Sequence, residues 1–183
     1  MKGELKQNNK SNITLSIDSS ILTEIQDDAK TEGTSANAKI NSILAKYILF
    51  YRYAELQEMM IMPPKIFAAM FDVIDENKMI DLLNQVAVDT MPSVFAHNNI
   101  DPTIDNLIKY CFEGIFIWGG MCSSFRHYVD EHEYRCLVLE HKYGIKWSNT
   151  IAKSLSFFIE SMTKKPAKYK VLPSTVVLMI KER

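Results

Sequence analysis

The sequence predicts a helix-rich α+β protein. In this fold an N-terminal strand and two helices precede a mostly helical domain with a small β-β-α-β sheet. Three observations carry this prediction. Residues 12–18 alternate strictly between polar and apolar side chains, which indicates a strand. Residues 21–62 repeat apolar side chains at three- and four-residue spacing, which indicates helices. Beyond Pro63, further helical patterns lead into segments rich in β-branched residues.

The stretch NITLSID, residues 12–18, is the predicted N-terminal strand. One of its sides is apolar and needs a core, whereas the other holds short hydrogen-bonding side chains instead of the Lys and Glu of an ordinary solvated face. The apolar side consists of Ile13, Leu15 and Ile17, and the polar side of Asn12, Thr14 and Ser16. No other strand is predicted before residue 122, so this strand has no expected partner nearby in its own chain.

Two helices are predicted after the strand. The first covers residues 21–33, with N-cap side chains at 18–20 and Gly33 as the stop. The second follows the cap residues at 34–35 and runs without interruption toward Met62, because prolines at 63 and 64 cannot continue a helix.

A single strand with two short helices cannot close a hydrophobic core by itself. The unit is therefore predicted to form a homodimer, in which two copies pair their strands antiparallel across a two-fold axis and interlock their helices. The predicted dimer core consists of Ile13, Leu15, Ile17, Ile40 and Leu44.

Residues 10–52 resemble the ribbon-helix-helix DNA-binding transcriptional regulators, the superfamily of Arc, MetJ, CopG and NikR. The resemblance rests on ITLSID, the capped first helix, the turn at 33–35 and the second-helix pattern SANAKINSIL. It implies a cytoplasmic homodimer that regulates transcription and inserts its paired strands into the major groove of a two-fold symmetric, double-stranded DNA operator.

The resemblance also assigns DNA-contacting residues. The base readers would be Asn12, Thr14 and Ser16 of each subunit. The phosphate anchors would be the backbone amides of Thr34, Ser35 and Ala36, assisted by Lys6, Lys10 and Lys39. The first outward strand position is often Arg or Lys in this family, and here it is Asn12. Residues 1–53 carry seven Lys and Arg against six Asp and Glu, so base contacts are expected to supply much of the affinity.

The predicted domains are a flexible arm at 1–11, the ribbon-helix-helix domain at 12–53, a connecting helix at 54–62 and an α+β domain at 63–183. The last domain resembles no family we recognise. It is expected to sense an unknown small-molecule or metal effector, or to add dimer or tetramer contacts. The alternative to DNA binding is a protein-interaction or antitoxin-like scaffold in which the ribbon serves only dimerisation.

Within the C-terminal domain, helices are predicted at 65–74, 78–91, 104–120 and 145–162, and strands at 122–130, 133–141 and 167–181. Pro92 is expected near the end of the second helix. Aromatic side chains are numerous enough to line a ligand pocket, although a plain aromatic core is the simpler interpretation. They are Tyr110, Phe112, Phe116, Trp118, Trp147, Phe157 and Phe158.

Metal and catalytic chemistry find little support in the sequence. A tight turn at residues 131–132 would place His127 beside Cys136, a valid ligand pair for Zn or Cu, whereas a three-residue loop would separate them. We favour a partly buried core His and Cys, so no metal site and no cofactor are predicted. No G-x-S-x-G motif and no Gly-rich phosphate loop are present, so no enzyme activity is expected.

Composition agrees with a cytoplasmic protein. The net charge is −1, which excludes a generic polyanion binder. Three cysteines without a C-x-x-C pair suit a reducing compartment better than a disulfide framework. The polar N-terminus lacks the apolar segment of a signal peptide, and no apolar run is long enough to span a membrane.

Overall fold

The computed structural model describes residues 12–56, 59 and 62–182. The chain divides into two compact units, Met1–Leu44 and Ala45–Arg183, which are considered separately below. The flexible arm predicted at 1–11, with Lys6 and Lys10, lies outside the described residues.

The N-terminal unit contains α1 (Ser19–Thr31) and the beginning of α2 (Ala36–Lys46). The side chain of Asp18 caps α1 by accepting a hydrogen bond from the Ser20 amide at 2.9 Å. After α1, Gly33 adopts the left-handed conformation with φ 66°, and the Thr34 amide donates to the Ala29 carbonyl at 2.8 Å. This is a Schellman motif, which confirms Gly33 as the predicted end of the helix. The hydrogen bond at Asp18 confirms the predicted N-cap.

Residues 12–18 form no strand in the single chain, and the first strand among the described residues begins at Ser124. A paired ribbon is therefore not present in one copy of the protein. The second predicted helix continues beyond α2, since residues 36–56 are helical throughout. Its later part consists of a π-helical segment, η1 (Tyr47–Tyr51), and α3 (Arg52–Leu56).

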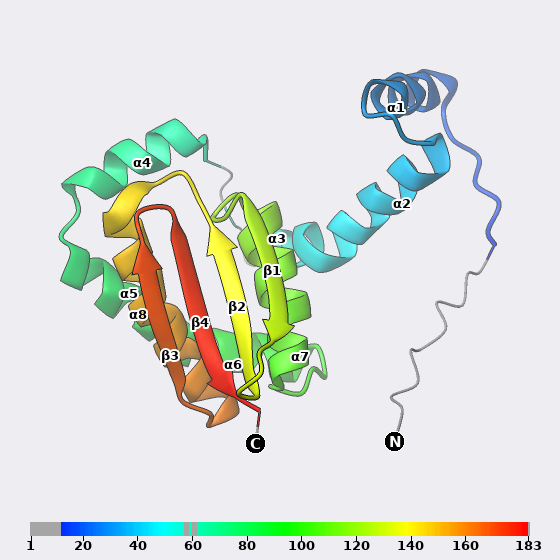
Figure 1. The fold of residues 1–183 in the computed structure, drawn as a ribbon. Coiled ribbons are helices and arrows are strands. Elements are labelled where there is room, and N and C mark those ends of the chain that lie inside the picture. The colour runs from blue at the N-terminus through cyan, green and yellow to red at the C-terminus, as the bar shows by residue number, and fades with distance from the viewer. Residues whose placement is uncertain (1–11, 57–58, 60–61, 183) are drawn as a thin grey trace. The chain divides into compact units, whose positions relative to one another are not determined.

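The C-terminal unit is an α+β structure, as predicted (Figure 1). Its remaining helices are α4 (Pro64–Val73), α5 (Glu76–Asp89), α6 (Met91–His97), α7 (Ile104–Asn106), η2 (Leu107–Phe116) and α8 (Gly144–Thr163). Helix α6 was not predicted, because Pro92 was expected near the end of the preceding helix. In the structure Pro92 instead lies in the first turn of α6. Proline is favoured in a first turn, where its missing N–H would have no helical partner.

The sheet contains four antiparallel strands in the order β1-β2-β4-β3. They are β1 (Ser124–Val129), β2 (Tyr134–Glu140), β3 (Ala167–Leu172) and β4 (Thr175–Lys181). The single strand predicted at 167–181 is wrong, because this segment forms a hairpin that turns at Pro173 and Ser174. Proline cannot donate to a strand ladder, which is the physical reason for the break.

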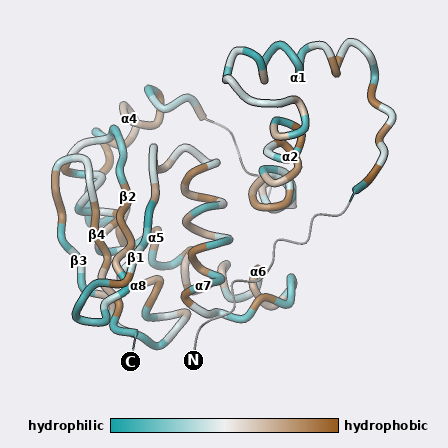
Figure 2. The backbone as a smooth tube through the Cα atoms, turned by 45° about the vertical axis from the view of Figure 1, so that its right-hand side comes forward, coloured by the Kyte–Doolittle hydropathy of each residue, from teal (hydrophilic) through white to brown (hydrophobic). Residues whose placement is uncertain are grey.

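The helices of this unit lie on one face of the sheet (Figure 2). The core between them is apolar and includes Leu137, Leu139, Leu178, Phe112, Ile151 and Ile159. Residues on the opposite face of the sheet are Arg126, Tyr128, Lys168, Lys170 and Lys181, and all five are exposed. Helices on one face of a four-stranded sheet thus enclose the core of this unit, with α8 packed against β3 and β4 and α5 packed against α8.

Candidate nucleic-acid interface and candidate ligand cavity

The predicted base-reading residues Asn12, Thr14 and Ser16 are all exposed. The apolar side chains that alternate with them are uncovered as well, since Ile13 is 78% exposed and Leu15 51%. Both sides of this segment are therefore open in a single chain.

The start of α2 supplies the predicted phosphate-anchoring groups. Ser35 acts as the cap, with its Oγ accepting from the Ala38 amide at 3.2 Å. The amide of Thr34 already donates to a carbonyl of α1, so it is used within the turn. The amides of Ser35 and Ala36 precede the first i→i−4 bond of the helix and are the ones that an anion would meet.

Lys39, the fourth predicted anchor in this region, is held by acidic neighbours. Its Nζ lies 2.5 Å from a carboxylate oxygen of Glu32 and 3.7 Å from one of Asp28. The hydrogen bond to Glu32 raises the pKa of Lys39, so its charge is fully present but locally offset. A phosphate would compete with both carboxylates for this ammonium group.

The predicted dimer-core residues have little to pack against within the N-terminal unit. Leu44 is 49% exposed and Ile40 is half-buried. Ala29 is the one buried residue among positions 12–44. This unit brings its apolar side chains to the surface instead of enclosing them.

The β1–β2 hairpin separates the two residues considered as metal ligands. His127 lies opposite Leu137, whereas Cys136 lies opposite Tyr128, so the two side chains point to opposite faces of the sheet. The loop has three residues and ends with Glu133 in the left-handed conformation at φ 59°. No cluster of potential metal ligands occurs within the part of the chain that the structure describes.

The clearest concave site is an apolar cavity of about 210 Å³ in the C-terminal unit. Its walls come from α4, α5, η2 and α8, with contributions from the segments around Met91 and Met121. Fourteen of the fifteen lining residues are apolar: Phe67, Met79, Leu83, Val86, Ala87, Met91, Cys111, Ile115, Phe116, Met121, Trp147, Ile151, Leu155 and Phe158. Three of the seven aromatic residues expected to line a pocket are among them.

The fifteenth lining residue is Ser154, on the buried face of α8. Its side chain is 6% exposed, and its Oγ has no hydrogen-bond partner among the described residues. The spacing in the sequence could have pointed to this residue, because Ser154 lies three residues after Ile151 and four before Phe158 and so shares their helix face.

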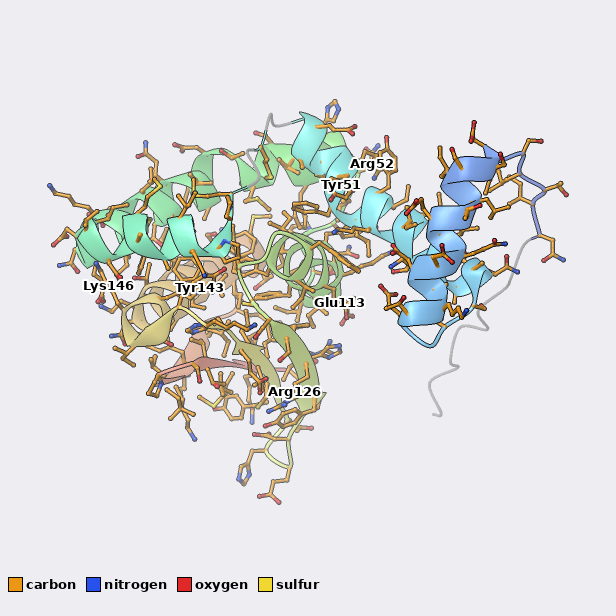
Figure 3. All side chains as sticks on the ribbon, turned by 90° about the horizontal axis from the view of Figure 1, so that it is seen from above. Tyr51, Arg52, Glu113, Arg126, Tyr143 and Lys146 are labelled. Atoms are coloured by element: carbon orange, nitrogen blue, oxygen red, sulfur yellow. The ribbon has the colours of Figure 1, made fainter. Side chains whose placement is uncertain are left out.

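Aromatic contacts and a lysine hold α4 against the cavity. The Trp147 ring makes edge-to-face contacts with Phe67 and Phe71, with ring centroids 5.1 and 5.2 Å apart. Lys146 Nζ donates to the carbonyls of Phe71, Asp72 and Ile74 at 2.8, 2.9 and 2.6 Å. Figure 3 labels Lys146 beside Tyr143 near this helix. The lysine thus caps the C-terminal end of α4.

Two buried cysteines have little thiolate character. Burial raises the pKa of Cys111 and of Cys122 to about 12. Cys111 lines the cavity and contributes a weakly polar thiol to its wall. Neither group is a nucleophile at neutral pH.

A second buried polar pair joins the end of β2 to α8. His141 Nδ1 accepts from the Tyr143 amide at 3.2 Å, and Nε2 lies 2.8 Å from Ser148 Oγ. In the neutral ring Nε2 then carries the proton and donates to the serine, so the histidine does not act as a base toward Ser148. Burial lowers the pKa of His141, which favours this neutral form.

No helix within the described segments is long and apolar enough to cross a membrane. Comparisons with protein-family models, with curated proteins and with solved structures found no significant match to this chain.

Proposed function

We propose that the protein is a homodimeric, sequence-specific DNA-binding transcriptional regulator of the ribbon-helix-helix type. The observation that carries this proposal is the uncovered apolar surface of the N-terminal unit. Ile13, Leu15 and Leu44 are all exposed in a single chain, and burying such side chains is the main source of stability in folding and association.

A second copy of the chain is the partner that fits this surface best. Two segments at 12–18 paired antiparallel would place Ile13, Leu15 and Ile17 of both copies on one side, over the helices. The same pairing supplies the ladder hydrogen bonds that the segment lacks in a single chain.

DNA is the proposed ligand because of the side chains on the opposite face. Asn12, Thr14 and Ser16 would then project from the ribbon toward the base edges, where Asn pairs with adenine and the hydroxyls serve several bases. The amides of Ser35 and Ala36 at the start of α2 would contact the phosphates. The side chain of Lys39 would first have to release Glu32.

The test is selection from a random double-stranded DNA library with the full-length protein at near-physiological salt. We expect enrichment of a two-fold symmetric site that is lost in the double variant Thr14→Ala with Ser16→Ala. Analytical ultracentrifugation should show that this variant is still a dimer. Leu15→Glu should instead give monomers, because it would bury a carboxylate in the dimer core.

A scaffold function is the second candidate, and a specific surface favours it. On α4, Ile66, Met70 and Val73 are exposed at spacings that place them on one helix face, with Val73 85% exposed. A dimer that enriches no DNA sequence, with or without small-molecule effectors, would favour the scaffold function. The scaffold would then keep its protein partner in the Thr14→Ala, Ser16→Ala variant and lose it on truncation near Pro63.

A further inference from the structure

We propose that the cavity of the C-terminal unit is a binding site for a neutral molecule of one or two fused rings that carries a single polar atom. Ser154 would form the hydrogen bond to this atom. Binding at the cavity does not depend on DNA binding, whereas a role for the molecule as an effector rests on the proposed function.

The size of the ligand follows from the volume of the cavity. Engineered apolar cavities of about 150 Å³ stay dry and bind benzene. At about 210 Å³, this cavity has room for roughly one further fused ring. Three methionines in the wall, Met79, Met91 and Met121, can adjust to the outline of such a ligand.

The charge of the ligand follows from the lining. Among the residues that the structure describes, no Asp, Glu, Lys, Arg or His contributes to the wall, and the one titratable group there is Cys111, whose pKa is raised to about 12 by burial. A carboxylate or ammonium in this cavity would lose its water without gaining a partner of opposite charge. The ligand must therefore enter uncharged.

Ser154 is exceptional within its own helix. Helical serines and threonines commonly donate to the carbonyl four residues earlier, and Thr150 and Thr163 do so at 2.9 and 2.7 Å. Every other hydroxyl of α8 is hydrogen-bonded as well: Ser148, Ser156 and Ser161. Among the hydroxyls of α8, that of Ser154 alone is buried without a hydrogen-bond partner in the described part of the chain, and its residue belongs to the cavity wall. Its Oγ is covered in the present rotamer, so turning the side chain about χ1 toward the cavity would break no hydrogen bond.

A buried hydroxyl without a partner is costly for an empty protein. A ligand atom that accepts or donates one hydrogen bond would satisfy it once the side chain has turned toward the cavity. Val86 both lines the cavity and is exposed on α5, so the cavity lies next to the protein surface at this helix. The geometry therefore points to a largely apolar ligand oriented by one polar contact.

Three probes of the same ring size test the proposal: naphthalene, 2-naphthol and 2-naphthoate. Binding to the full-length protein would be followed by methyl NMR of the methionines, with Met79, Met91 and Met121 reporting on the cavity. We expect 2-naphthol to shift these methyl signals and to bind roughly 3- to 10-fold more tightly than naphthalene, the value of one net hydrogen bond. The charged 2-naphthoate should not bind.

Variants then assign the polar contact. Ser154→Ala should reduce the affinity for 2-naphthol to that for naphthalene and leave naphthalene binding unchanged. Ser161→Ala removes a hydroxyl from the same helix outside the cavity and should change neither affinity. Ala87→Leu should fill the cavity and abolish both, with circular dichroism showing that the fold persists.

The proposal fails if none of the probes shifts the three methyl signals up to its solubility limit. It also fails if Ser154→Ala weakens naphthalene and 2-naphthol equally, or if Ala87→Leu leaves binding intact. None of these measurements involves DNA, so the outcome is independent of whether the N-terminal unit binds an operator.

Discussion

Replacing Lys146 with Met should destabilise the C-terminal unit by releasing the end of α4. The ammonium group donates to three carbonyls, of which those of Phe71 and Ile74 are in partly buried contacts and that of Asp72 is in an exposed one. Water can replace the exposed bond at little cost, whereas each partly buried bond contributes about 1 kcal/mol, less than a fully buried bond to a charged group because water still solvates the ammonium. The expected loss is about 2 kcal/mol, since Met keeps the apolar stem of the side chain.

The assay is urea denaturation followed by tryptophan fluorescence, because Trp147 packs against Phe67 and Phe71 of α4. In a thermal melt followed by the same fluorescence, a loss of about 2 kcal/mol should lower the Tm by roughly 4–8 °C for a chain of this size. Lys153→Met is the matched control on the same helix. Its ion pair with Glu76, at 3.2 Å, is largely solvent-exposed and should contribute less than about 1 kcal/mol. Equal effects of the two substitutions would refute the capping role of Lys146.

Three further outcomes are expected. Gly114→Ala should lower the free energy of unfolding by about 1–3 kcal/mol in denaturant titrations, because the added Cβ would lie 2.6 Å from the Leu49 carbonyl oxygen. Burial lowers the pKa of His141 in the folded protein, so the unfolded chain binds a proton at this residue first as the pH falls below about 6.5. The free energy of unfolding should therefore decrease with falling pH, by at most about 1.4 kcal/mol per pH unit. His141→Gln should flatten this pH dependence between pH 7.5 and 5.5. Iodoacetamide should modify Cys111 and Cys122 slowly in the folded protein and rapidly in urea, as mass spectrometry would show, since burial raises both thiol pKa values to about 12.

Local signals in the sequence were enough to locate most helices. The cap at Asp18 and the glycine at 33 determine the two ends of α1 through contacts within a few residues. Such contacts can be read from spacing, because the groups that satisfy one another are close along the chain.

The features that were missed depend on contacts between distant segments or on unusual backbone conformations. The sequence leaves the register of the β1–β2 hairpin open between a tight turn and a three-residue loop. The loop that forms places Glu133 in the left-handed conformation, which Gly and Asn adopt more readily, so the residue type at 133 does not decide between the two turns. Ser154 is a candidate binding group because η2 and α5 leave a cavity beside it. Helical spacing puts this residue on the same face as Ile151 and Phe158, but spacing alone cannot show the cavity beside it.

The contact between Lys146 and α4 is made to main-chain oxygens, and this has an evolutionary consequence. Any residue at positions 72 and 74 presents the same carbonyls, so substitutions there can accumulate without loss of the hydrogen bonds to Lys146. The exposed side of α4, including Val73, is therefore free to diverge while the helix keeps its place over the cavity. One invariant lysine would allow related proteins to vary an outer surface and conserve the chamber beneath it.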